Sequence, residues 1–158
     1  MTLVSSVSPG VPLLIAFGVL AGMVATRAMD VVMGRLPEGE TPPFIAAGVL
    51  TEQSPETASA RLAAVVHHVA GWLTGPLFVT MLLLAGSVLG DGVVAYLATG
   101  VVLLALMVGF FAVVVLPRPG LPRQRVRTIT RDWAVSAVGY LLVLVPLVAG
   151  GATGLSGL

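Results

Sequence analysis

Residues 93–116 read VVAYLATGVVLLALMVGFFAVVVL and contain no charged side chain. An α-helix needs about 20 consecutive apolar residues to cross the hydrocarbon core of a bilayer, so this segment predicts a transmembrane helix. Three more apolar runs reach that length, at about 11–34, 58–89 and 128–150. The sequence therefore predicts an all-α protein, with one integral membrane domain over residues 1–158 and four transmembrane helices.

The overall composition supports this class. Hydrophobic residues make up 57% of the chain and charged residues only 9%, whereas a soluble domain has roughly 25% charged residues. Cysteine is absent, which excludes disulfides and thiolate metal sites. The net charge is +1 and no basic run is interleaved with aromatic residues, so nucleic acid is not an expected partner. The expected partner is the lipid bilayer, and the sequence requires no cofactor.

The connections between the apolar runs have distinct signals. Arg35-Leu36-Pro37 ends the first predicted span, because proline cannot continue a helix. Residues 38–57 are mostly polar, but their apolar piece 44–50 predicts a short helix along the membrane interface. Ser54-Pro55-Glu56 has the order of hydroxyl, proline and acid that favours a helix start, so the second long helix is expected to begin there. Gly90-Asp91-Gly92 predicts a tight turn.

The arginines predict an orientation. The connections before and after the middle pair of spans lie on the same side of a four-span protein, and all eight basic residues flank them: Arg27, Arg35, Arg61, Arg118, Arg123, Arg125, Arg127 and Arg131. Arginine-rich loops face the cytoplasm in the positive-inside rule. We therefore expect an antiparallel bundle in the plasma membrane, with both termini and the 90–92 turn outside.

Ionisable groups within predicted spans are the candidate functional residues, because charge in hydrocarbon is expensive and usually faces a protein interior or an aqueous cavity. Five such residues are expected at a similar depth near the cytoplasmic surface: Arg27, Asp30, His67, His68 and Asp132. Histidine beside aspartate suits a proton or ion relay, so these residues predict a polar pocket. The set His67, His68 and Asp30 could also bind a divalent metal.

A purely structural interpretation of the same residues is open as well. Arg27 could pair with Asp30 three residues on, one histidine could hydrogen-bond a neighbouring helix, and Asp132 could sit in the first turn of the last span beside Arg131. Small residues four apart let helix backbones approach closely, which predicts helix packing at Gly18, Gly22, Gly71 and Gly75. We expect both histidines to flank that contact rather than face lipid.

Two segments of the sequence resemble elements of a known group of proteins. Residues 21–30, AGMVATRAMD, and 67–75, HHVAGWLTG, resemble uncharacterised small four-helix membrane proteins of prokaryotes. Those proteins have a G-x-x-A-T-x-x-M-D element in the first helix and an H-x-x-x-G element in the second. The resemblance covers about the first half of the chain and implies a fold and a membrane location, but no activity. Arg27 departs from the pattern of the first element.

Two classes of function remain open from the sequence. No phosphate-binding glycine loop, nucleophile elbow or H-E-x-x-H motif is present, which favours a non-enzymatic protein: a small transporter or a subunit of a membrane complex, which could also form a homo-oligomer. The alternative is a metal-binding membrane enzyme or redox-associated protein that uses the histidine and aspartate side chains.

Overall fold

The structure is a computed structural model that describes residues 10–155, and this part of the chain is helical without β-strands. Its elements in chain order are α1 (Gly10–Met33), α2 (Thr41–Thr51), α3 (Ala60–Leu89), α4 (Val93–Phe110), the π-helical turn η1 (Phe111–Val115) and α5 (Arg123–Leu155). Four helical segments are long and apolar enough to cross a membrane: α1, α3, α4 with η1, and α5. The predicted all-α class is confirmed for the described residues, and a helical segment long and apolar enough to cross a membrane lies at each of the four predicted spans.

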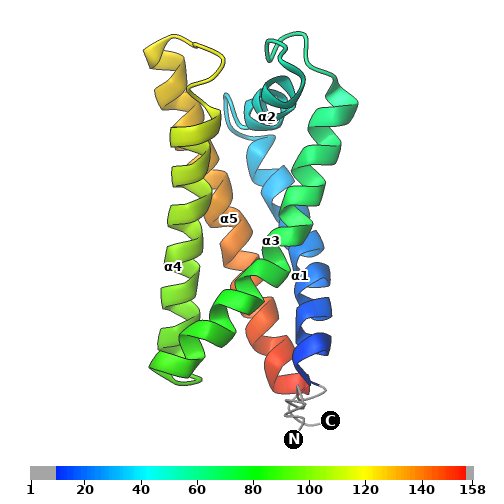
Figure 1. Cartoon of the computed structure of the whole chain (residues 1–158), viewed down its shortest axis with the longest axis vertical. Helices are drawn as coiled ribbons and strands as arrows, with labels where there is room; N and C mark the ends of the chain where they lie inside the picture. The colour runs from blue at the N-terminus through cyan, green and yellow to red at the C-terminus, as the bar shows by residue number, and fades with distance from the viewer. Residues whose placement is uncertain (1–9, 156–158) are drawn as a thin grey trace, which may run out of the picture.

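Figure 1 shows the four long helices side by side, with the α3–α4 turn at the same end as the start of α1 and the end of α5. We call the opposite end, which carries α2 and the α4–α5 connection, the head end. The predicted turn at Gly90-Asp91-Gly92 joins α3 to α4. Gly90 has a φ of +78°, a conformation that glycine adopts without steric penalty.

The second span lies close to its predicted position at 58–89, but the predicted start of its helix at Ser54 is wrong. The Ser54 carbonyl accepts hydrogen bonds from the amides of Thr57 and Ala58, which closes a separate turn. The helix begins at Ala60 instead, because Ser59 has an extended backbone and its hydroxyl accepts from the Leu62 amide at 3.4 Å. The last span also begins earlier than predicted, at Arg123 rather than near 128, because a helix that extends beyond the hydrocarbon can include charged residues.

Glycines bring α1 and α3 into close contact. A Cβ atom on Gly75 would overlap the Gly18 carbonyl oxygen, and one on Gly22 would lie 2.9 Å from the carbonyl oxygen of Gly71. We call these four residues the glycine seam. Helix α5 joins α1 and α3 at the same level, where the buried Tyr140 of α5 donates a hydrogen bond to the Gly71 carbonyl at 2.6 Å. The core therefore lies where α1, α3 and α5 meet.

The short helix predicted at 44–50 is present as α2, and it packs against the bundle. Ile45 on α2 is fully buried against Phe111, Leu116 and Ile129 of the α4–α5 region. Helix α2 thus packs against α3, α5 and η1 at the head end of the bundle (Figure 1).

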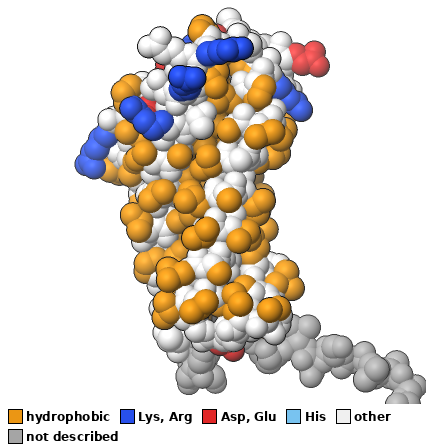
Figure 2. Space-filling model, turned by 90° about the vertical axis from the view of Figure 1, so that its left-hand side faces the viewer, with side chains coloured by type: hydrophobic (Ala, Val, Ile, Leu, Met, Phe, Trp, Pro, Cys, Tyr) orange, Lys and Arg blue, Asp and Glu red, His pale blue; other side chains and the backbone are white. Residues whose placement is uncertain are grey.

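Charge is distributed unevenly along the molecule. On the face shown in Figure 2 the basic side chains gather at the head end, and the surface below them is largely hydrophobic. Large side chains on α4 and η1 are among the most exposed apolar groups: Val93 on α4 is 73% exposed and Val113 on η1 is 75% exposed. In water such a surface would favour aggregation, whereas lipid tails would solvate it.

Candidate functional site

Four of the five candidate residues meet between α1 and α3. The Nε2 atom of His67 lies 2.7 Å from Asp30 Oδ1. Arg27 Nη1 lies 3.3 Å from Asp30 Oδ2 and 3.0 Å from His68 Nε2, and this His68 nitrogen is 3.6 Å from the same Asp30 oxygen. We call Arg27, Asp30, His67 and His68 the Asp30 cluster.

The hydrogen bonds indicate the tautomer of each histidine. His68 Nδ1 lies 2.7 Å from the Ala64 carbonyl oxygen, which can only accept, so this nitrogen carries the proton. In the neutral ring His68 Nε2 is then free to accept from Arg27. His67 Nε2 faces a carboxylate and therefore carries its own proton. The two rings lie 5.2 Å apart, nearly perpendicular to one another.

The glycine seam explains how these side chains reach one another. Asp30 is two helical turns beyond Gly22 on α1, and His67 is one turn before Gly71 on α3. The side chain of Thr26 fills the space where a Cβ atom of Gly71 would lie. Because the backbones approach so closely at the seam, an aspartate from one helix can hydrogen-bond a histidine from the next.

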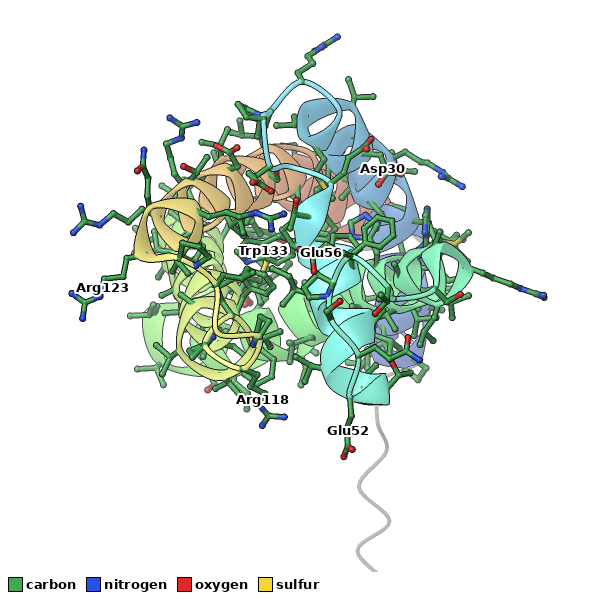
Figure 3. The ribbon with its side chains drawn as sticks, turned by 90° about the horizontal axis from the view of Figure 1, so that it is seen from above. Asp30, Glu52, Glu56, Arg118, Arg123 and Trp133 are labelled. Atoms are coloured by element: carbon green, nitrogen blue, oxygen red, sulfur yellow. The ribbon has the colours of Figure 1, made fainter. Side chains whose placement is uncertain are left out.

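The cluster runs from the interior of the bundle to its surface. The His67 side chain is 9% exposed, that of Asp30 32% and that of Arg27 72%. In Figure 3, which looks down on the head end, Asp30 lies toward the edge of the bundle. The carboxylate thus stands between a buried imidazole and an exposed guanidinium.

Asp132 lies apart from the cluster. Its side chain is fully buried on α5, where it accepts a hydrogen bond from the Glu38 amide at 2.9 Å and pairs with Arg131 at 2.8 Å. In the described part of the chain, no hydrogen bond or ion pair joins Asp132 to the Asp30 cluster. Its contacts hold the α1–α2 connection against α5, which agrees in part with the structural interpretation of the sequence.

Sequence reasoning missed a second group of charged residues at the head end. Arg125 Nε lies 2.9 Å from Glu38 Oε1 and Arg125 Nη1 lies 3.0 Å from Glu56 Oε1. We call these three residues the Arg125 clamp, because they tie both ends of the α1–α3 connection to α5. The partners are 87 and 69 residues apart. Only the excess of acids in one connection and of arginines in the other pointed to such pairing.

The clamp predicts a pH dependence of stability. The hydrogen bond from Arg125, with a further one from Thr41, lowers the pKa of Glu38 below its ordinary value of 4.5. A depressed pKa in the folded state stabilises the protein above the unfolded pKa, and this contribution is lost as the pH falls through the folded value. We expect Glu38→Gln to lower the free energy of unfolding in detergent at pH 7 by roughly 0.5–1 kcal/mol. The difference from the wild type should shrink as the pH falls below the ordinary carboxyl pKa of 4.5 and through the lower folded value.

The matched control for this prediction is Glu52→Gln. Glu52 is an exposed acid at the same end, and it makes no ion pair within residues 10–155; Figure 3 shows it pointing away from the bundle. The control should unfold like the wild type at pH 7. A stability difference between Glu38→Gln and wild type that stayed constant from pH 7 to pH 3 would contradict the assignment.

A cavity of about 470 Å³ lies between α3, α4 and α5, below α2. Its wall is almost entirely apolar, and the side chain of His67 forms part of it. Pro42, Pro43 and Ala46 of α2 line its head end, and Leu77 and Leu103 line its deeper part. The same imidazole therefore contacts both the Asp30 carboxylate and the cavity.

The π-helical turn shapes the cavity wall. The Leu116 amide donates to the Phe111 carbonyl at 2.8 Å, five residues back. Single π-helical turns occur frequently at functional sites. Phe111 packs against Trp133 with ring centroids 5.0 Å apart, and both rings line the cavity. The Trp133 indole donates to the Met107 carbonyl at 3.1 Å, and Figure 3 shows Trp133 toward the middle of the bundle.

The structure gives a metal site little support. Across residues 10–155, no three or more side chains of the His, Cys, Asp or Glu type are grouped so that they could hold a metal ion. Within the set His67, His68 and Asp30, the His68 Nε2 atom faces the Arg27 guanidinium at 3.0 Å. A cation bound there would meet the positive charge of that guanidinium.

Comparisons with protein families, with curated proteins and with solved structures found no match for this chain. The resemblance of residues 21–30 and 67–75 to small prokaryotic membrane proteins therefore stays a prediction. The class of the protein therefore follows from its own features. It is a helical protein with four segments suited to cross a membrane, a cluster of titratable groups between two of them, and an apolar cavity beside that cluster.

Proposed function

We propose that this protein spans the plasma membrane four times as an antiparallel bundle, with its head end in the cytoplasm and both termini outside. The position of all eight arginines at one end of the molecule supports this orientation. Lipid tails then surround the exposed apolar side chains of α4, and the single acid at the opposite end, Asp91, faces the outside.

Within that membrane the protein acts as a small proton-coupled transporter. The observation that supports this function is the double role of His67, which hydrogen-bonds Asp30 at 2.7 Å and also forms part of the cavity wall. Intramembrane acids and histidines commonly mark proton and substrate pathways. Protonation of the cluster would then be sensed directly by whatever occupies the cavity.

The geometry suggests the route of the proton. A proton from the cytoplasmic water reaches the partly exposed Asp30 carboxylate beside Arg27 and His68. When Asp30 becomes a neutral acid, its hydroxyl can donate to His67 Nε2 in place of accepting from it. The imidazole then releases its Nε2 proton to water and takes up one proton from water at Nδ1, with no change in its own charge. The charge on the cluster thereby changes the polarity of one side of an otherwise apolar cavity.

Proton flux into liposomes tests this proposal. Purified protein is reconstituted with a pH-sensitive dye inside the vesicles, a potassium diffusion potential is imposed, and the rate of internal pH change is recorded. Asp30→Asn should reduce the protein-dependent rate at least about tenfold, because the amide cannot release a proton in this pH range. Asp91→Asn is the matched control, since it makes the same chemical change outside the cluster, and its rate should equal that of the wild type.

Two results would count against the proposal. Equal flux in wild type and Asp30→Asn would remove Asp30 from the mechanism. Absence of protein-dependent flux in every variant would favour a subunit or scaffold role in a membrane complex, for which the exposed apolar surface of α4 offers contact area.

A further inference from the structure

The cavity opens sideways between α3 and α4. These two helices are joined by the short turn at residues 90–92 and diverge toward the head end (Figure 1). The cavity-lining side chains that are most exposed lie on these two helices: Leu77 is 47% exposed, Leu106 53% and Phe110 62%. In a membrane this opening faces lipid, and α2 covers its head end. A molecule dissolved in the bilayer could therefore enter without passing through water.

The chemistry of the wall restricts what can bind. Among the described residues that line the cavity, none is Asp, Glu, Lys or Arg, and an unpaired charge in such a site would be expensive. Phe110, Phe111 and Trp133 provide flat apolar surface, and Met29 and Met107 can adapt to different shapes. The volume of about 470 Å³ is in the range of small-molecule sites. The wall thus fits an uncharged, mostly apolar ligand.

The Trp133 indole in the cavity wall donates to the Met107 carbonyl. Three more polar side chains line the cavity in the described part of the chain, and two of them are also engaged. The Tyr140 hydroxyl donates to the Gly71 carbonyl, and the Thr74 hydroxyl donates to the Ala70 carbonyl. His67 differs, because only its Nε2 atom has a partner among the described residues. With the proton on Nε2, its Nδ1 atom carries a lone pair that can accept a hydrogen bond.

We propose that the cavity binds a lipid-soluble alcohol: an uncharged molecule with a long apolar body between α3 and α4 and one hydroxyl group that donates to His67 Nδ1. This assignment names the substrate class of the proposed transporter and in that sense rests on it. The hydroxyl group would satisfy His67 Nδ1, which has no partner within residues 10–155, while the apolar body replaces lipid tails against the aromatic side chains.

Fluorescence quenching of Trp133 tests the assignment. The chain has two tryptophans, so Trp72→Phe leaves Trp133 in the cavity wall as the single reporter. Bromoundecanol is titrated into the purified protein in detergent micelles, and its methyl ether serves as the second probe, because a bromine atom in contact with an indole ring quenches its fluorescence. The alcohol should quench saturably and bind about three- to tenfold more tightly than the ether, the value of one hydrogen bond.

Two substitutions in this background make the test specific. Ala70→Phe places a ring in the cavity wall and should abolish saturable quenching, whereas Ala105→Phe on the lipid-facing side of α4 should leave it intact. His67→Phe should make the affinities for alcohol and ether equal. Non-saturating quenching that is the same in all variants would overturn the site, because it reports partition into micelles only. Equal affinity for alcohol and ether in the Trp72→Phe protein would overturn the hydroxyl contact.

The binding test leaves Asp30 unchanged and needs no proton flux, so the two proposals can fail separately. Saturable binding with normal flux in Asp30→Asn would overturn the relay and support the ligand site. Loss of flux in Asp30→Asn without saturable quenching would support the relay and overturn the ligand site.

Discussion

Gly75→Leu should separate α1 from α3 and lower the free energy of unfolding by more than about 3 kcal/mol. The reason is the backbone contact at the glycine seam. A Cβ atom on Gly75 would overlap the carbonyl oxygen of Gly18 and come within 3.1 Å of the Cα atom of Gly22. A backbone cannot rotate away as a flexible side chain can, so the helices must move apart. The expected loss is measured by unfolding the detergent-solubilised protein with increasing mole fractions of dodecyl sulfate.

Gly109→Leu is the matched control for this prediction. Gly109 is also within a long apolar helix, α4, but a Cβ atom there would meet no atom within 4 Å. The free energy of unfolding of the control should lie within about 0.5 kcal/mol of the wild-type value or slightly above it, because leucine favours a helix more than glycine does. Equal stability of Gly75→Leu and Gly109→Leu would show that α1 and α3 do not pack through the glycine seam.

Asp132→Leu is expected to destabilise the protein by about 1–3 kcal/mol. The substitution removes the only acceptor that the described residues offer to the Glu38 amide, and it removes the partner of Arg131. Asp132→Asn keeps an oxygen that can accept from the Glu38 amide, so its loss of stability should be about half of that in Asp132→Leu. Unfolding in dodecyl sulfate measures both variants, and hydrogen exchange at residues 36–41 should increase in Asp132→Leu.

Asp91→Leu is the control for this second prediction. Asp91 is exposed at the end of the molecule opposite Asp132, and its replacement should change the stability by less than about 0.5 kcal/mol. If Asp132→Leu and Asp91→Leu unfolded alike, the buried carboxylate would have no role in holding the α1–α2 connection against α5.

Most of the fold could be predicted from the sequence, because hydrophobic length and turn residues are local signals. The span predicted at 93–116 corresponds to α4 followed by η1, and the glycines at 90 and 92 indicated the turn between α3 and α4. The helix start at Ser54 was wrong because two hydroxyl residues, Ser54 and Ser59, could each cap a helix. The choice between them depends on the turn that residues 54–58 form, which no local pattern reports.

The candidate site was predicted only in part. Charged residues within apolar runs pointed to Asp30, His67 and His68, and the spacing of small residues pointed to the seam that brings α1 and α3 together. Asp132 has the same sequence signal, but it lies on α5, and its direction depends on where that helix begins and on the path of the α1–α2 connection. The cavity had no sequence signal, since it is formed by the divergence of α3 from α4 and by the π-helical turn.

Accessibility labelling in intact cells tests the central claim, that one end of a four-span bundle carries every arginine on the cytoplasmic side. Because the chain has no native cysteine, the single-cysteine variants Arg61→Cys, Arg123→Cys and Asp91→Cys each report one exposed position. A membrane-impermeant maleimide should label position 91 in intact cells, and positions 61 and 123 only after permeabilisation. Labelling of 61 and 123 from opposite sides of the membrane would contradict the topology and the function proposed from it.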